Sequence, residues 1–402
     1  MAYEINEAKA LVVEAGKKLV ESGLIARTWG NVSARISDTQ FVITPSGRAY
    51  ETLTPDEIVV VNIADCEYEG DIKPSSEKGV HADAYKLRPD VDFIIHTHQV
   101  NASIISAAGI PIKDIPAKDA KVLGPIVPVG AYGMPSTGAL REGVAAAVEA
   151  NPESKAVIMK HHGALCMGAS LDEAFKIAET LEALCAKEVG RLTEFACGKK
   201  YKPDNLYKAF ATVFPGSGDA PVDLGSSKRI NDELFELSME NGTHYVCTMQ
   251  GVGKNGIAPR VALIHAAIYR NCKVKFIVPF ASDDVKALSY GVDKLTPYLD
   301  DFAQIAGRDV KVCNWLRASY RTDADEIGKA AKGRSAIVIR GQGALCTGNS
   351  MFDIDAVKLV LEKECKTEMY SLIKSGVKSL SPIDCAIMRT IYVLKYSKQA
   401  SK

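Results

Sequence analysis

The sequence predicts an α/β protein in which one fold, a sheet flanked by helices, is present twice. Three observations lead to this expectation. The chain has 402 residues, more than one ordinary hydrophobic core accommodates. Helical stretches alternate unevenly with short apolar strands, which is typical of a sheet covered by helices. Long segments of the first half also recur in the second half, which indicates two domains of one fold.

The first half contains four helical and four strand-like stretches. Helices are expected near residues 4–22, 78–88, 138–150 and 171–196, where apolar residues recur at helical spacing. Strands are expected near residues 40–44, 57–62, 91–97 and 155–160, which are short and apolar. Periodicity alone does not fix the order of these strands in the sheet.

The internal repeat is clearest around two apolar strands. Residues 156–170 match residues 336–350 at an offset of 180. Upstream, His81, Ala82 and Tyr85 recur as His265, Ala266 and Tyr269, and the strand at 93–98 faces residues 276–281. A repeat of this length indicates a duplicated domain and not a short-period solenoid.

Proline and glycine residues gather between the two copies and interrupt any long helix there. They are Pro203, Pro215, Gly216, Gly218, Pro221 and Gly225. We therefore expect a first domain over residues 1–200, a linker over residues 201–227 and a second domain over residues 228–402.

Composition limits the classes of partner. Forty-nine basic residues balance forty-nine acidic ones, so the chain lacks the basic excess that nucleic acids or acidic membranes attract. The first residues read as an amphipathic helix and not as a signal peptide or a membrane span. The ten cysteines are scattered without the spacing of a disulfide scaffold. We expect a cytoplasmic protein that binds neither nucleic acid nor membrane.

Four of the seven histidines stand in two clusters, His96-Thr97-His98 and His161-His162-Gly163. Residues two apart on a strand share a face, so His96 and His98 suit two neighbouring positions around one metal ion. Adjacent residues point to opposite faces, so we expect only one of His161 and His162 to be a ligand. The alternatives are a polar strand end for the first pair and a capping or core histidine for the second.

The second copy favours the metal interpretation. At the four histidine positions it has Pro279, Ala281, Gly341 and Gln342, although the surrounding residues are retained. The fold therefore does not need these histidines. The opposite holds for His81, which His265 preserves, and we interpret His81 as structural.

Ser75, Ser76 and Glu77 precede the helix that carries His81. Such residues at a helix start usually form a cap, but free N–H groups and hydroxyls there also bind phosphate. The second copy reads Pro259-Arg260-Val261 at this place, so the serines and the glutamate disappear together with the histidines. Joint loss indicates joint function.

Two further loops are polar and contain glycine, at residues 28–33 and 44–47. Loops of this kind form turns, and they also present backbone N–H groups to anions. The second copy has no room for either of them, because its helix starts only about 34 residues after Lys228.

Five motifs of residues 1–200, taken together and in order, resemble the class II aldolase/adducin family. They are Gly30-Asn31-Val32-Ser33, Thr44-Pro45-Ser46-Gly47, Ser75-Ser76-Glu77, His96-Thr97-His98 and His161-His162-Gly163. The second half resembles the family only in its later portion and without these residues. The resemblance implies a three-layer fold with a central, mostly antiparallel sheet between helices.

The resemblance also implies roles for individual residues. In the family's aldolases, zinc is bound by histidines that correspond to His96, His98 and His162, and Glu77 corresponds to the catalytic acid/base. The substrate phosphate is held by residues that correspond to Asn31, Ser46, Gly47, Ser75 and Ser76. Active sites in the family lie between subunits of a tetramer, which implies a homo-oligomer with sites between domains.

One departure concerns the aldehyde half of the substrate. An aldolase of the family has a catalytic tyrosine shortly after an Ile-Pro pair, and residues 110–116 contain none. Lys113, Lys118 and Tyr132 are the candidates to replace it.

The resulting expectation is a zinc-dependent aldolase that cleaves a phosphorylated ketose to dihydroxyacetone phosphate and an aldehyde. The family's epimerases carry aspartate where this chain has Glu77, which favours aldol chemistry. The alternatives are a sugar-phosphate epimerase, a metal-dependent decarboxylase or dehydratase, and a non-catalytic adducin-like assembly module. Three histidines also suit Fe²⁺ or Mn²⁺. In this interpretation, the second copy supplies one wall of a site in the assembly.

Overall fold

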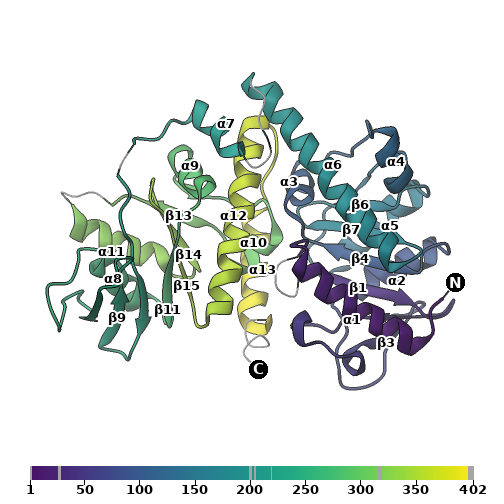
Figure 1. Ribbon diagram of the computed structural model, residues 1–402, viewed down its shortest axis with the longest axis horizontal. Coiled ribbons are helices and arrows are strands. Elements are labelled where there is room, and N and C mark those ends of the chain that lie inside the picture. Colours follow the sequence, from purple (N-terminus) through teal and green to yellow (C-terminus); the bar gives the residue numbers. More distant parts are fainter. Residues whose placement is uncertain are drawn as a thin grey trace. The chain divides into compact units, whose positions relative to one another are not determined.

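The computed structural model describes residues 2–25, 29–198, 202, 205–218, 220–315 and 319–396. Thr28 of the first expected loop and Pro203 of the expected linker lie outside the described residues. The chain forms two compact units, residues 1–192 with 391–402, and residues 193–390 (Figure 1). The division between Leu192 and Thr193 falls within a long helix, upstream of the segment rich in proline and glycine.

The first unit contains a seven-stranded sheet with the order β3-β2-β1-β4-β7-β6-β5. Its neighbours are antiparallel except for β5 and β6, which are parallel. The expectation of a mostly antiparallel sheet is confirmed. The strands are β1 (Asn31–Arg35), β2 (Gln40–Ile43), β3 (Val59–Asn62), β4 (Phe93–Thr97), β5 (Val129–Gly130), β6 (Ala156–Met159) and β7 (Gly163–Gly168).

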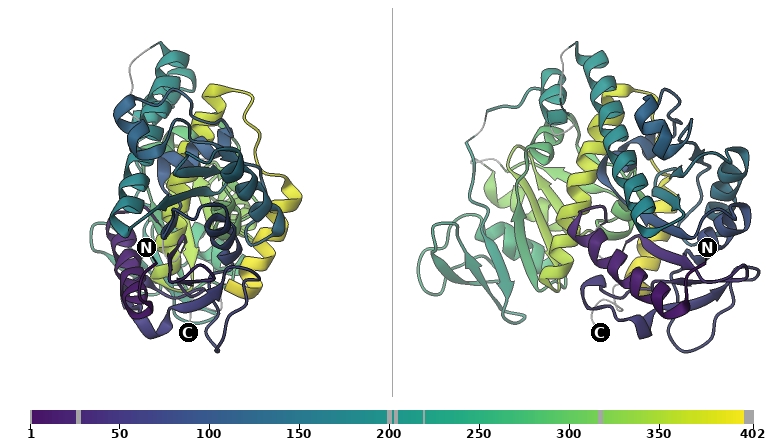
Figure 2. Two further views of the ribbon diagram at one scale, coloured as in Figure 1. Left: turned by 90° about the vertical axis from the view of Figure 1, so that its right-hand side faces the viewer. Right: turned by 45° about the vertical axis from the view of Figure 1, so that its right-hand side comes forward.

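Helices cover both faces of this sheet. On one face, α2 and α5 pack on each other and share one buried cluster with the strands, to which Val80, Val144 and Ile94 belong. On the other face, α1 packs on β1 and β2, α3 packs on β6 and β7, and α6 runs along the same side as α1 (Figures 1 and 2). The helices are α1 (Ile5–Glu21), α2 (Lys78–Leu87), α3 (Val100–Ala108), α4 (Ala117–Leu123), α5 (Gly138–Ala150) and α6 (Leu171–Cys197).

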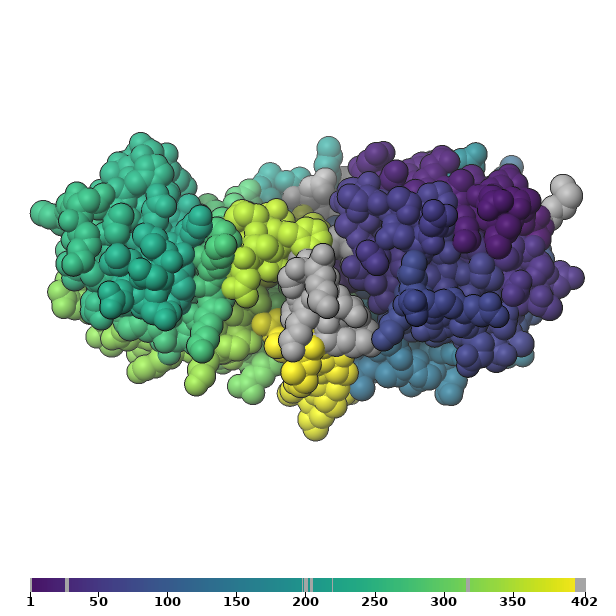
Figure 3. Space-filling model, turned by 90° about the horizontal axis from the view of Figure 1, so that it is seen from below, coloured from purple at the N-terminus to yellow at the C-terminus, as the bar shows by residue number. Residues whose placement is uncertain are grey.

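Helix α1 has the amphipathic character that the sequence predicts. Its buried side carries Ala8, Val12 and Leu19, whereas Glu7 and Glu14 are exposed. Residues at these spacings fall on opposite sides of a helix, so burial of the apolar side fixes α1 on the sheet. Its exposed side contributes to the dark purple surface of the first unit in Figure 3.

The second unit repeats the strand order of the first and adds one edge strand, giving β10-β9-β8-β11-β15-β14-β13-β12. Among the described strands of this unit, only β13 and β14 are parallel neighbours, at the place of β5 and β6. The duplication therefore includes the whole sheet. The strands are β8 (Ser226–Arg229), β9 (Leu234–Ser238), β10 (His244–Thr248), β11 (Phe276–Phe280), β12 (Lys294–Leu295), β13 (Val310–Cys313), β14 (Ala336–Ile339) and β15 (Gly343–Gly348).

Helices also cover both faces of the second sheet. Helices α8 and α11 pack together over one face, α9 packs on β14 and β15, and α12 packs on β15 and β11. Helix α7 lies in the segment expected to be a linker and packs on α9 and α12. None of the helices in the described ranges has the length and apolar character of a membrane span. The helices are α7 (Leu206–Val213), α8 (Ala262–Asn271), α9 (Asp283–Gly291), α10 (Asp300–Ile305), α11 (Tyr320–Ala331), α12 (Met351–Lys374) and α13 (Pro382–Ile391).

A buried serine–histidine–tyrosine triad occurs in both units. In the first unit the Ser33 hydroxyl lies 2.7 Å from His81 Nδ1 and 2.8 Å from the Tyr85 hydroxyl. In the second unit the corresponding distances, from Ser227 to His265 and Tyr269, are 2.7 and 2.9 Å. The triad joins β1 to α2 and β8 to α8, so it is part of the shared fold.

The repeat therefore reaches further upstream than the sequence comparison indicated. Arg35 donates to the carbonyls of Tyr85, Arg88 and Val91, and Arg229 donates to the equivalent carbonyls around the end of α8. Ser227 and Arg229 thus stand where the first unit has Ser33 and Arg35. The second copy retains this strand, and Gly225 takes the position of Asn31.

The eight expected helices and strands of the first half are present within a few residues of their expected ends. One interpretation was wrong, because residues 28–33 were treated as a loop and β1 begins at Asn31. β1 pairs with β2 on one side and β4 on the other, and its five residues are buried. Pairing on both edges stabilises a strand whose polar composition resembles that of a loop.

The buried triad predicts a pH dependence of stability in the second unit. Burial lowers the pKa of His265 from its usual 6.5 to about 4. Between these pH values the unfolded chain binds a proton that the folded chain does not, so the free energy of unfolding decreases as the pH falls. We expect a loss of at most about 3 kcal/mol between pH 7 and pH 4. Urea denaturation of the wild type and His265→Gln over this range measures it. The variant is expected to show a smaller pH dependence, and equal slopes would contradict the prediction.

Candidate metal centre

The histidines come together because β4 lies between β1 and β7. His96 of β4 is paired with Asn31 of β1 and with Leu165 of β7. His98 follows the end of the same strand, and His162 lies in the turn that joins β6 to β7. The sheet order therefore brings the end of β4 next to that turn.

The three histidine side chains form a compact cluster. Their ligand nitrogens all lie within 4.8 Å of one another, and all three residues are buried. The Nε2 atoms of His96 and His98 are 3.0 Å apart. Two ring nitrogens this close, each with a lone pair available in the neutral ring, suit a shared cation between them.

A backbone carbonyl fixes the ring orientation of His96. Its Nδ1 lies 3.0 Å from the carbonyl oxygen of Ala164 in β7, and a carbonyl only accepts hydrogen bonds. Nδ1 therefore carries the hydrogen, and the Nε2 lone pair is directed to the cluster. Burial lowers the pKa of His96 well below its usual value, which favours the neutral ring that a metal requires.

Glu77 lies at the N-cap position of α2, but its side chain makes no capping hydrogen bond. Its carboxylate instead lies 3.1 Å from His162 Nε2 and 3.4 Å from His96 Nε2. Asn31 Nδ2 donates to the same carboxylate over 3.2 Å. Burial alone would raise the pKa of Glu77, but the interaction with His162 and then with His96 lowers it well below its usual value.

These residues fit a divalent transition metal. Three imidazole nitrogens converge, and a fourth, anionic group lies beside them. Three histidines with a remaining open position are the arrangement of a catalytic metal site and not of a closed structural one.

His161 is not part of this cluster of ligand nitrogens. The two adjacent histidines lie in a turn and not on a strand, and His161 has a left-handed backbone with φ of 63°. Its ring packs edge-on against Tyr132, with ring centroids 5.5 Å apart. The second copy has glycine at this position, Gly341, with φ of 72°.

Four of the five expected phosphate-binding residues lie on two loops that the structure joins. Pro45 and Pro74 form an isolated β-bridge, and Ser46 and Ser75 donate their N–H groups to the carbonyls of Lys73 and Thr44. Ser46, Gly47, Ser75 and Ser76 therefore lie close together, next to Glu77. The N–H groups of Ser46 and Ser75 already donate to these carbonyls, so binding of an anion here would depend strongly on the serine hydroxyls. Asn31 approaches from β1, through its bond to Glu77.

The structure distinguishes the three candidates for the missing tyrosine. Lys113 and Lys118 are exposed, whereas Tyr132 is half-buried and contacts His161, the neighbour of a histidine in the cluster.

Two contacts were not anticipated from the sequence. Ser136, which has a left-handed backbone, bonds to Ser76 over 2.8 Å, and His81 bonds to Asn31. No local sequence pattern distinguishes Ser136. The preservation of His81 as His265 indicates a structural role and does not reveal the contact with Asn31.

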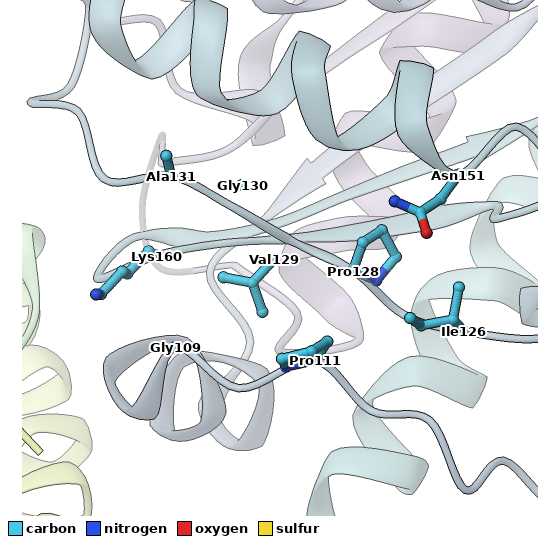
Figure 4. A pocket seen from close by; sticks show the side chains of 9 residues that line it. All are labelled: Gly109, Pro111, Ile126, Pro128, Val129, Gly130, Ala131, Asn151 and Lys160. Carbon is cyan, nitrogen blue, oxygen red and sulfur yellow. The ribbon is translucent and has the colours of Figure 1, made fainter. Parts of the chain in front are cut away.

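A pocket of about 390 Å³ lies beside strand β5 (Figure 4). Its wall is mostly apolar, with Lys160 and Asn151 at opposite ends in the close view. Lys160 immediately precedes His161, but neither Glu77 nor any of the three clustered histidines lines this pocket. It is therefore separate from the metal centre.

The second copy fills the equivalent place with its own chain. Gln342, at the position of His162, accepts from the N–H of Val222 over 2.7 Å and donates to the carbonyl of Ala220 over 3.3 Å. The Tyr290 hydroxyl lies so close to Gly341 that a side chain there would collide with it. In the second copy, the position of His162 is thus hydrogen-bonded to the backbone of residues 220 and 222, and the position of His161 has no room for a side chain.

Two segments of the chain, residues 10–189 and 228–369, match the family model for the class II aldolase and adducin N-terminal domain. These segments comprise most of the chain. The protein belongs to the class II aldolase and adducin family, and it contains the family domain twice.

Relatives of known activity match about half of the chain. This chain is 37% identical over 179 residues to the 5-methylthioribulose-1-phosphate/5-deoxyribulose-1-phosphate aldolase of Escherichia coli O45:K1. The aligned residues cover 43% of this chain and 79% of the relative. This chain is 34% identical over 181 residues to the L-fuculose phosphate aldolase of Escherichia coli O6:H1, which covers 45% and 82%. A solved structure of L-fuculose 1-phosphate aldolase is 33% identical to this chain, with a TM-score of 0.43. The alignment covers 49% of this chain and 90% of that structure.

We predict that the purified protein holds about one divalent transition-metal ion per chain. His98→Ala removes one of three ligands and should lose most of this metal, whereas His161→Ala should retain it. Elemental analysis by mass spectrometry after gel filtration measures the metal content. Equal retention by both variants would exclude His98 as a ligand, and equal loss would mean that His161 also supports the site.

Proposed function

We propose that this protein is a metal-dependent class II aldolase that cleaves a phosphorylated ketose to dihydroxyacetone phosphate and an aldehyde. The chemistry is assigned to residues 1–200, and residues 228–402 form a metal-free copy. The single observation that carries the proposal is the position of the Glu77 carboxylate, within 3.4 Å of two clustered histidines and not at the helix cap. This arrangement supports a role for Glu77 as an acid/base beside a metal that acts as a Lewis acid.

Zinc held by His96, His98 and His162 would polarise the ketose carbonyl and stabilise negative charge that develops on it, and Fe²⁺ and Mn²⁺ are the alternatives. Breaking the C3–C4 bond leaves the electron pair on C3 of the phosphorylated half. Glu77 delivers a proton to that carbon in cleavage and removes it in the condensation direction. The carboxylate form of Glu77, which its low pKa favours, removes the C3 proton in the condensation direction. In cleavage the C4 hydroxyl loses a proton as the aldehyde forms, and this loss balances the proton that Glu77 delivers to C3.

The phosphate group would be bound by Asn31, Ser46, Gly47, Ser75 and Ser76. Support comes from the β-bridge between Pro45 and Pro74, which holds the two serine-containing loops together beside Glu77. The two relatives described above are named as aldolases of sugar phosphates, which agrees with a phosphorylated substrate. Tyr132 is our candidate for protonating the aldehyde oxygen, because it contacts the turn that carries His162.

We also propose that the protein is a homo-oligomer. The support is the resemblance of its first half to a family whose sites form between subunits. Light scattering coupled to gel filtration tests this proposal, and a monomeric mass would overturn it.

Glu77→Gln should lower the rate of aldol cleavage by about 10²- to 10⁴-fold, because the amide cannot exchange the proton at C3. A panel of ketose 1-phosphates, assayed with and without a chelator, identifies the substrate first. Release of dihydroxyacetone phosphate is then followed with a coupled dehydrogenase.

The matched control is Glu51→Gln, at an exposed glutamate, which should retain wild-type activity. Both variants should retain their metal and their thermal stability within a few degrees. Full cleavage activity in Glu77→Gln would exclude the proposed role of Glu77.

A further inference from the structure

A continuous chain of hydrogen bonds links the core of the first unit to the metal centre. It runs from the Tyr85 hydroxyl to Ser33, from Ser33 to His81 Nδ1, and from His81 Nε2 to Asn31 Oδ1. Asn31 Nδ2 then donates to Glu77 over 3.2 Å. The first four residues of this chain are buried, so water does not compete for these bonds.

The second unit shows in which direction these hydrogen bonds point. His265 Nε2 lies 2.8 Å from the carbonyl oxygen of Leu224, and a carbonyl only accepts. Nε2 of His265 must therefore carry a hydrogen. Burial keeps the ring neutral, so Nδ1 is an acceptor, and the Ser227 hydroxyl donates to it. The Tyr269 hydroxyl in turn donates to Ser227.

The same direction satisfies every partner in the first unit. Burial lowers the pKa of His81 to about 3, so its ring is also neutral and has one N–H group. With the hydrogen on Nε2, His81 donates to Asn31 Oδ1 and accepts from Ser33. The amide of Asn31 then turns its NH₂ group to the carboxylate of Glu77. With the hydrogen on Nδ1, the amide must reverse, which places an oxygen against that carboxylate.

We propose that His81 is a positioning residue for the active site. Its Nε2–H group selects the orientation of the Asn31 amide, and that amide holds the Glu77 carboxylate in place. His81 touches neither the metal ligands nor a reacting atom and acts through Asn31. The kinetic part of this proposal rests on the proposed aldolase function, whereas the orientation of the amide does not.

The second unit separates the structural role of the triad from this positioning role. Gly225 stands at the position of Asn31, with φ of 62°, and a Cβ atom there would lie 2.9 Å from Leu237. The triad is thus retained in the second unit, although His265 there binds the main-chain carbonyl of Leu224 and the hydrogen bonds do not continue to a catalytic residue. His265 therefore provides a matched control for His81 within the same chain.

The test compares His81→Leu with His265→Leu in the metal-loaded, full-length protein. Both variants lose two buried hydrogen bonds, one to a serine hydroxyl and one to an oxygen acceptor, and should lose similar thermal stability. Only His81→Leu should lower kcat, by about 10- to 100-fold, because a misoriented amide is expected to cost one charged hydrogen bond. Its metal content should be unchanged. His265→Leu should keep kcat within about twofold, and an equal loss of kcat in the two variants would overturn the proposal.

A double-mutant cycle tests whether His81 acts through Asn31. In an Asn31→Ala background, His81→Leu should cause little further loss of kcat, because there is no amide left to orient. His81→Gln, whose side chain retains an N–H donor, should recover part of the loss. Fully additive losses would overturn the proposed route. If His81→Leu does not fold, Ser33→Ala compared with Ser227→Ala replaces this pair.

A spectroscopic measurement separates this proposal from the aldolase function. ¹⁵N spectra of protein labelled at histidine distinguish ring nitrogens with and without hydrogen, and spectra of the two leucine variants assign the signals. We expect His81 and His265 both to carry hydrogen on Nε2. A hydrogen on Nδ1 of His81 would overturn the positioning role, whether or not any ketose phosphate is cleaved. Absence of cleavage with the expected spectrum would overturn only the proposed function.

Discussion

The pairing of β4 with both β1 and β7 is the constraint on which the active site depends. It places His96 opposite Asn31 on one side and opposite Leu165 on the other, so that one strand end meets residues distant in the sequence. The carbonyl of Ala164 in β7 orients the ring of His96, and the bridged loops beside β1 bring Glu77 to the same point. Among the proposed ligands and Glu77, only His96 lies within a strand, and the sheet fixes the short segments that carry the others.

The position of the Glu77 carboxylate serves the site at the expense of the stability of helix α2. A glutamate at a helix N-cap can stabilise the first turn, yet this carboxylate is buried against histidines. A buried carboxylate is costly unless it is paired and hydrogen-bonded. Asn31 and the neighbouring histidines supply this compensation, and a cation bound by the histidines would add to it.

The second unit shows which parts of the fold are independent of the chemistry. It retains the strand order, the buried triad and the arginine that binds the carbonyls at the end of α8. Where the ligands are absent, Gln342 pairs with the backbone of Ala220 and Val222, and Leu224 supplies the carbonyl that replaces the Asn31 side chain. The Leu224 carbonyl thereby satisfies the buried N–H group of His265, as buried polar groups require, whereas the hydrogen bonds of Gln342 are exposed.

The sequence by itself determined the duplication, most element positions and the candidate residues, because hydrophobic spacing and motifs are local properties. It also marked His96, His98, His162 and Glu77 as one group through their joint loss in the second copy. It did not reveal β1, whose polar residues form a strand only because two neighbours pair with it. Nor could it show that His81 is both structural and linked to the site. His265 is preserved for the triad, and only the tertiary structure decided that Nε2 of His81 meets Asn31 whereas Nε2 of His265 meets a main-chain carbonyl.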